Sequence, residues 1–133
     1  MLVYSQKLRD ICLESCGKGA GTIELNKAIM ELPVKKQSHL LETYYRGDGS
    51  LHQRTHKMVR ACTISRTLAW QIQELLARQG HYATISIRKG GDDVILGRKI
   101  TRKDQYILYH CPDRMMGEVR RQGNVFLVPI KEI

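Results

Sequence analysis

The stretch "LLETYYRGDGS", residues 40–50, runs from an apolar segment directly into a carboxylate between two glycines. Its large apolar side chains recur at the spacing of one helical face, which predicts a helix over residues 35–47. These side chains are Leu40, Leu41, Tyr44 and Tyr45. The Gly-Asp-Gly that follows has three competing interpretations: a helix stop, a tight hairpin turn or a metal site.

A hairpin turn is disfavoured because Asp-Gly turns join alternating strands, whereas the residues before Asp48 have helical spacing. A helix stop needs only one glycine, and Gly49 would provide it. That leaves Gly47 unexplained. Gly47 and Thr43 are both small and lie one helical turn apart, so they would let a second helix approach this face closely.

Two copies of Asp48 would meet if that second helix carried the same motif. Two carboxylates at neighbouring helix C-termini repel each other, and a hard divalent cation between them would remove that repulsion. Mg²⁺ prefers oxygen ligands and retains water molecules, which suits phosphodiester chemistry. We therefore interpret Asp48 as a metal ligand beside a helix-pairing face. That face consists of Leu40, Thr43, Tyr44 and Gly47.

The chain of 133 residues carries 22 Lys and Arg against 13 Asp and Glu, a formal net charge of +9. An excess of this size indicates a polyanionic partner, although a basic protein without such a partner can have the same composition. With 42% hydrophobic residues, the chain is expected to fold as a single domain over residues 1–133. We divide that domain into a linker-like segment (1–35), a core (36–117) and a C-terminal hairpin or tail (118–133).

Nothing in the sequence indicates a membrane protein or a secreted one. No segment approaches the roughly 18 uninterrupted apolar residues of a membrane-spanning helix, so we expect no membrane partner. The first residues, "MLVYSQKLRD", lack the apolar run of a signal peptide. The four cysteines lack zinc-finger spacing, and we interpret them as reduced thiols. We expect a cytoplasmic location, in the interior of a bacterial or archaeal cell.

The pattern of apolar and turn-forming residues predicts an α+β domain with an antiparallel sheet. Ser65 has the chemistry of a helix N-cap, and Gly80 that of a helix stop. Between them, one apolar stripe is formed by Leu68, Ile72, Leu75 and Leu76. The expected elements are a helix (5–16), a helical turn (27–33), a helix (35–47), a hairpin (51–65), a helix from Ser65 to Gly80, a strand (82–88), a basic loop (89–103), a strand (104–110) and a hairpin (119–130).

One face of such a sheet packs on helices and the other faces solvent. The expected solvent face holds donors and acceptors but no carboxylate: His52, Arg54, His56, Tyr82, Thr84, Ser86, Arg88, Lys103 and Gln105. Cations bind phosphates, mixed donors and acceptors read base edges, and a β-ribbon fits the major groove. We interpret this face as a surface for double-stranded DNA. A merely solvated basic face is the alternative.

The segment "LETYYRGDG", residues 41–49, resembles the nine-residue motif of the LAGLIDADG homing endonucleases. The longer form "LLETYYRGDGS" is similar to the second motif of the endonuclease domains found inside inteins. Further segments are similar to the intein pattern in the same order: "GKGAGTIELNKAIMELPVKKQSHLLETYYRGDGS", "ISRTLAWQIQELLARQGHYATISIR", "ILGRKITRKDQYILY" and "GNVFLVPIKEI". The resemblance therefore covers most of the chain.

The resemblance implies the fold αββαββα, with a saddle-shaped antiparallel sheet lying on DNA. It implies site-specific double-strand cleavage that depends on Mg²⁺ or Mn²⁺, with Asp48 as a catalytic metal ligand next to Gly47. A basic residue near the scissile phosphate would support the reaction. Lys103, Arg102 and Lys99 are the candidates for that role, and the sequence does not rank them.

Only one such motif is visible, so cleavage requires either a homodimer or a second LAGLIDADG half supplied by another segment. A second function is compatible with the same fold. Maturases and some transcription regulators are similar in fold but bind DNA or RNA without cleaving it. The sequence leaves both functions open, and Mg²⁺-dependent nicking distinguishes them.

Overall fold

The computed structural model describes residues 5–51, 57–113 and 119–129, and the predicted DNA contacts His52, Arg54 and His56 lie outside these ranges. The elements in order are α1 (Gln6–Cys16), α2 (Lys27–Met30), α3 (Val34–Asp48), β1 (Gly49–Leu51), β2 (Val59–Thr63), α4 (Arg66–Arg78), β3 (Ala83–Arg88), β4 (Gly91–Ile95), β5 (Arg98–Arg102), β6 (Gln105–His110), β7 (Arg120–Gln122) and β8 (Val125–Leu127). The α+β class with an antiparallel sheet is confirmed. From α3 to β6 the order is αββαββββ, because the hairpin β4–β5 stands between the last two strands of the expected αββαββ pattern, and no helix follows β6 in the described residues.

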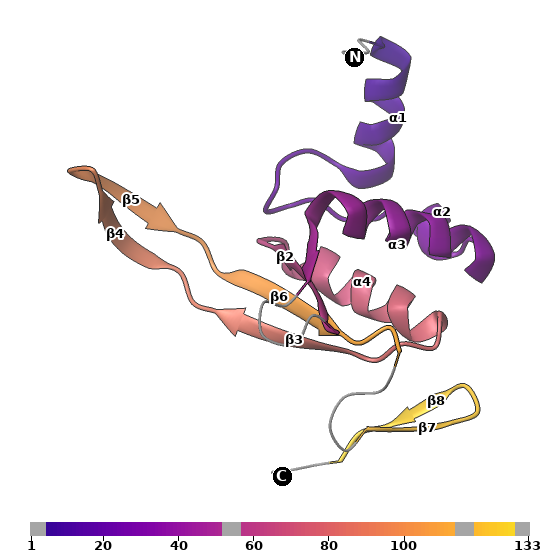
Figure 1. The fold of residues 1–133 in the computed structure, drawn as a ribbon. Helices are drawn as coiled ribbons and strands as arrows, with labels where there is room; N and C mark the ends of the chain where they lie inside the picture. Colours follow the sequence, from indigo (N-terminus) through magenta and orange to yellow (C-terminus); the bar gives the residue numbers. More distant parts are fainter. Residues whose placement is uncertain (1–4, 52–56, 114–118, 130–133) are drawn as a thin grey trace.

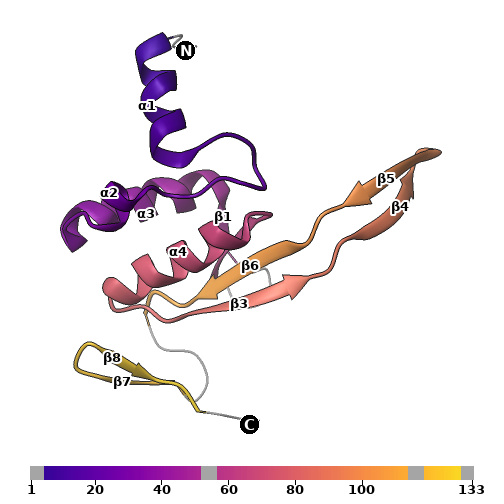
Figure 2. The same ribbon diagram turned by 180° about the vertical axis from the view of Figure 1, so that it is seen from behind.

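The main sheet has four antiparallel strands in the order β1-β2-β6-β3. Helices α3 and α4 lie together on one face of this sheet, and the opposite face carries no helix in the described chain (Figures 1 and 2). The strand residues alternate between the two faces. Ala61, Ala83 and Leu108 point toward the helices and are buried. The side chains between them in sequence therefore point to the other face.

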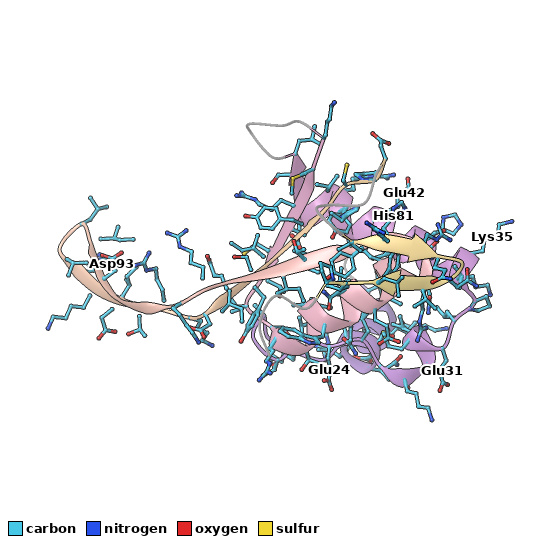
Figure 3. The ribbon with its side chains drawn as sticks, turned by 90° about the horizontal axis from the view of Figure 1, so that it is seen from below. Glu24, Glu31, Lys35, Glu42, His81 and Asp93 are labelled. Atoms are coloured by element: carbon cyan, nitrogen blue, oxygen red, sulfur yellow. The ribbon has the colours of Figure 1, made fainter. Side chains whose placement is uncertain are left out.

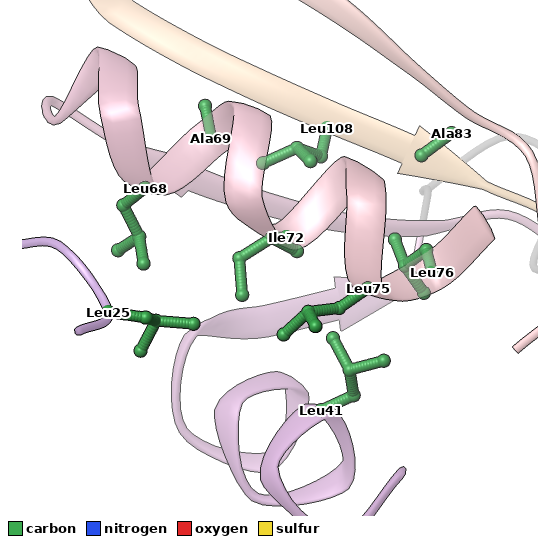
Figure 4. Packing of buried hydrophobic residues seen from close by; sticks show 9 residues of the cluster. All are labelled: Leu25, Leu41, Leu68, Ala69, Ile72, Leu75, Leu76, Ala83 and Leu108. Atoms are coloured by element: carbon green, nitrogen blue, oxygen red, sulfur yellow. The ribbon is translucent and has the colours of Figure 1, made fainter. Parts of the chain in front are cut away.

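The core lies around α4 (Figure 4). The expected stripe of Leu68, Ile72, Leu75 and Leu76 is buried. In Figure 4, Leu25 and Leu41 approach α4 from one side, and Leu108 and Ala83 lie on its sheet side. The Oγ atom of Ser65 accepts the backbone N–H of Leu68 at 3.2 Å, which confirms the predicted N-cap.

Part of the segment that the sequence suggested as linker-like packs into the core. Leu25 is only 8% exposed, and its backbone N–H and carbonyl both bond to the Gln71 side chain, each at 2.8 Å. The Ser65 hydroxyl donates to the Ile23 carbonyl at 2.6 Å. By contrast, α1 has no buried residue and extends away from the helical layer (Figure 1).

The predicted basic loop at 89–103 is wrong, because these residues form the antiparallel hairpin β4–β5. It continues from β3 and β6 as an arm that projects beyond the helices (Figure 1). Figure 3 shows Asp93 on this arm, away from His81 and Glu42 on the body. Leu96 and Gly97 both have positive φ, 51° and 76°, as a tight hairpin turn requires. A leucine at the first of these positions concealed the turn, since glycine or asparagine is usual there.

Asp104 anchors the base of the arm. Its carboxylate accepts the Gly90 backbone N–H and the Lys89 ammonium, both at 2.9 Å. The same two groups hold the pKa of Asp104 below its usual value. The hydrogen bond from Gly90 lowers it most, and the one from Lys89 contributes less. The arm therefore leaves the sheet in a fixed direction.

None of the described helices combines the length and apolarity that a membrane span requires.

Candidate functional site

Asp48 is the last residue of α3, and the first strand begins at Gly49. Its side chain is exposed and, in the part of the chain that the structure describes, makes no hydrogen bond or ion pair. The C-terminus of a helix carries partial negative charge from unpaired carbonyl groups. A free carboxylate at this position therefore increases the local attraction for a cation.

Helix α3 is held by aromatic side chains on the face toward the sheet. The Tyr45 ring lies 4.9 Å from the His110 ring and 5.4 Å from the Tyr44 ring. Burial, with the nearby His81 as a smaller contribution, lowers the pKa of His110 to about 4, so it is neutral at pH 7. Burial, followed by the negative charge of Asp48 and then Cys62, raises the pKa of Tyr44 to about 12. These contacts fix the direction in which α3 presents Asp48.

The two glycines around Asp48 have different surroundings. A β-carbon at Gly49 would lie 2.2 Å from the Tyr45 carbonyl oxygen, so only glycine fits there. Gly49 does not adopt a left-handed conformation; its φ and ψ are −85° and 153°, and its N–H donates to the Tyr45 carbonyl. A β-carbon at Gly47 would meet no atom within 4 Å, so the fold of the described chain does not require glycine there.

An apolar groove of about 530 Å³ runs beside α3 and ends at Asp48. It is lined by Cys16, Ile23, Leu25, His39, Leu40, Thr43, Tyr44, Asp48, Leu68 and Ile72. The structure thus brings together three residues expected at a helix pair, Leu40, Thr43 and Tyr44, with the expected metal ligand. The groove is open along a helical face, and Gly47 stands exposed one turn after Thr43.

The residues around Asp48 fit one part of a shared metal site. Among the described residues, no three His, Cys, Asp or Glu side chains come together as a complete set of metal ligands. One chain therefore offers a single carboxylate at the groove end. A second helix bearing the same motif would supply another, as hard divalent cations require several oxygen ligands.

The face of the sheet away from the helices holds four of the six expected DNA contacts that the structure describes. Strand pairing sets its residues in rows: Arg60, Tyr109 and Thr84 in one, Cys62, Ile107 and Ser86 in the next, and Gln105 with Arg88 in the third. We call these eight residues the outer face. Thr84, Ser86, Arg88 and Gln105 were expected there, and no carboxylate interrupts them. Arg60, Cys62, Ile107 and Tyr109 were missed.

Two expected members lie elsewhere. Tyr82 precedes β3, and its ring lies 5.9 Å from the Phe126 ring in the C-terminal hairpin, so it does not belong to the outer face. Lys103 lies between β5 and β6, and its Nζ is 3.6 Å from the position that a β-carbon on Gly21 would take. Lys103 therefore points toward the loop after α1. Of the other basic candidates, Arg102 forms an ion pair with Asp93 at 3.2 Å, and Lys99 lies on the arm.

The family model described as a LAGLIDADG-like domain matches residues 35–110, which run from α3 to the end of β6. The chain belongs to the LAGLIDADG-like family. The match contains the α3 helix end, the four-stranded sheet and the arm. It therefore includes the outer face and the α3 and α4 residues of the groove, whereas Cys16, Ile23 and Leu25 of the groove lie before it.

The LAGLIDADG-like chain is also similar to longer proteins. It is 36% identical over 133 residues to an iron-sulfur cluster assembly SufBD family protein of Mycobacterium bovis, and equally to those of two Mycobacterium tuberculosis strains. The alignment covers 98% of this chain but only 16% of each relative. The chain thus corresponds to a small part of the curated relatives it matches.

Proposed function

We propose that this LAGLIDADG-like chain is the DNA-cleaving unit of a homing endonuclease. It would make Mg²⁺-dependent double-strand breaks as a homodimer or as half of a two-motif enzyme. The observation that supports this most is the Asp48 carboxylate, which is unpaired among the described residues and lies at the end of an apolar groove on an open face of α3. A helix from a second unit would fill the groove and bring a second carboxylate to the same point.

The chain's own residues have separable tasks in this proposal. The outer face binds duplex DNA, with Arg60 and Arg88 on phosphates and the hydroxyl and amide groups on base edges. Asp48, with the adjacent carbonyl of Gly47, would hold a divalent metal. A bound divalent metal would activate water and stabilise the charge on the phosphate. Lys103 is proposed to support that charge, and the arm extends the contact with DNA.

The small share of each relative that the alignment covers suggests that such a unit lies within a longer protein. A segment that corresponds to 16% of an iron-sulfur cluster assembly SufBD family protein is compatible with an endonuclease unit inserted in a host protein. Insertion is the arrangement of intein endonucleases, which the motif resembles. We propose the same arrangement here, and nothing in α3 or the outer face indicates a role in iron-sulfur assembly.

Duplex binding by the outer face is the first test. Arg60→Ala and Arg88→Ala should each weaken binding to duplex DNA, and each should reduce the slope of log affinity against log salt by about one unit. Fluorescence anisotropy over a salt series measures both quantities. Arg9→Ala, at an exposed arginine on α1, is the matched control and should change neither.

Two results would contradict this surface assignment. One is affinity that does not change with salt, because phosphate contacts always release counterions. The other is an Arg9→Ala variant that loses as much affinity as the two outer-face variants. Either result would indicate that another surface binds DNA, or that the basic charge serves no specific contact.

Helix pairing through α3 is the second test. Gly47→Leu should abolish self-association, because a leucine side chain would separate two helices that pack at this position. It should leave the monomer folded, since the position is open within the described chain. Sedimentation velocity measures the mass, and circular dichroism the fold. Gly91→Leu on the arm is the control, because that glycine is equally open.

Wild-type protein that remains monomeric at high concentration would exclude the homodimer and favour a second half on another segment. Gly47→Leu protein that still forms the wild-type dimer would exclude α3 as the dimer interface. The second candidate function, a non-cleaving DNA- or RNA-binding module, is favoured by one observation: the described residues of a single chain form no complete set of metal ligands around Asp48. Mg²⁺-dependent nicking separates the two functions.

A further inference from the structure

The middle row of the outer face differs in chemistry from the rows beside it. Ile107 lies on β6, an interior strand of the sheet, and its register partners are Cys62 on β2 and Ser86 on β3. The row on one side contains Arg60, Tyr109 and Thr84, and the row on the other contains Gln105 and Arg88 (see the strand positions in Figure 1). The middle row is therefore less polar than the two rows beside it, each of which contains an arginine.

A face used only for solubility gains nothing from Ile107. Its side chain is half-buried, although it points away from the core that Leu108 enters. Threonine has the same β-branched fit to a strand without adding apolar surface in water. Cys62 beside it is exposed and also weakly polar. Leaving these side chains in contact with water costs free energy, which contact with an apolar group would recover.

Duplex DNA offers one apolar group on the major-groove edges of its bases, the C5-methyl group of thymine. The same group is present on 5-methylcytosine. Outward residues on a strand are about 7 Å apart, close to twice the base-pair step of about 3.4 Å, so successive rows face every second base pair. Arg60 and Arg88, in the rows on either side of Ile107, are then placed to bind phosphates or guanines.

We propose that Ile107, with Cys62 next to it, binds the 5-methyl group of a pyrimidine and so determines specificity for a methylated base at the middle of the DNA segment that one outer face covers. This rests on the proposed function, in that the outer face must bind duplex DNA. Ser86 is the third member of the row and contacts the edge of the neighbouring base. A homodimer would read two symmetry-related positions, and a half-enzyme one.

The test begins with sites selected from a randomised duplex library by the wild-type protein. Each thymine is then replaced singly by uracil, which removes only the methyl group. One position, or one symmetric pair, should lose about fourfold in affinity per methyl, the value expected from burying one such group. Placing cytosine there should weaken binding as well, and 5-methylcytosine should bind more tightly than cytosine. The last comparison separates the methyl group from the rest of thymine.

The protein variants assign the effect to a residue. Ile107→Ala should remove the difference between thymine and uracil, whereas Ile107→Val should keep most of it. Ile87→Ala is the control, because Ile87 is an isoleucine of the same sheet that is more exposed than Ile107 (49%) but lies on the opposite face, in register with Tyr106. It should keep the full difference. The uracil series uses wild-type protein, so it is informative even if Ile107→Ala fails to fold.

Site-specific binding with no response to uracil at any position would overturn this proposal and leave the DNA-binding function standing. A response that persists in folded Ile107→Ala protein would assign the methyl contact to another residue and also overturn it. Absence of any duplex binding by the wild type would overturn the proposed function together with this contact.

Discussion

Asp48→Asn is expected to reduce Mg²⁺-dependent DNA cleavage by more than about 100-fold while leaving DNA affinity unchanged. The amide keeps the shape of the carboxylate but loses the charge that a hard cation requires. The fold should survive, because the wild-type carboxylate is exposed and unpaired in the described chain and lies at the negative end of a helix. Removing its charge should leave the melting temperature equal or slightly higher.

Three quantities are measured on each protein: plasmid cleavage in Mg²⁺, duplex affinity by anisotropy and melting temperature by circular dichroism. Glu42→Gln is the control, since Glu42 is exposed on the same helix and pairs with Arg46 at 2.9 Å. It should cleave as the wild type does. A purely structural Asp48 predicts the reverse pattern, a lower melting temperature with cleavage retained, and that pattern would exclude the metal role.

Gly49→Ala is expected to destabilise the fold by about 3 kcal/mol or more, a value at the upper end of the cost of overpacking. Its β-carbon would lie 2.2 Å from the Tyr45 carbonyl oxygen and 2.9 Å from the Tyr45 carbonyl carbon. Backbone atoms cannot rotate away as a flexible side chain can, so the end of α3 or the start of β1 must shift. Urea denaturation measures the free energy of unfolding.

Gly47→Ala is the matched control one position before Asp48. It is inside α3, and no atom lies within 4 Å of the added carbon. Alanine should therefore stabilise the helix by about 1 kcal/mol relative to glycine. Equal losses of stability in the two variants would contradict the different roles assigned here, in which Gly49 serves the fold and Gly47 keeps a helix face open.

The sequence alone predicts the parts of the fold in which local chemistry and burial agree. The Ser65 cap and the α4 stripe follow from spacing, and both are present as expected. Alternation along β3 assigns Ala83 to the core and Thr84, Ser86 and Arg88 to the outer face. The end of α3 at Asp48 also follows from the apolar spacing before it.

Other features depend on pairing between distant segments. The run "QYILYH" is apolar on both faces of β6, so alternation alone cannot tell that Leu108 points inward and Ile107 outward. The arm was missed because Leu96 occupies a left-handed turn position that its side chain does not favour. Tyr82 has the alternation of an outer-face residue but packs beside Phe126, from a hairpin more than 40 residues later.

Cleavage of a randomised duplex library in Mg²⁺ and in EDTA, with the solution mass determined on the same sample, tests the central claim most directly. We predict staggered double-strand breaks at a preferred site in Mg²⁺, none in EDTA, and a mass that corresponds to a dimer. A confirmed dimer that binds duplex DNA but cuts no member of the library in Mg²⁺ or Mn²⁺ would contradict the endonuclease function and leave a DNA-binding module.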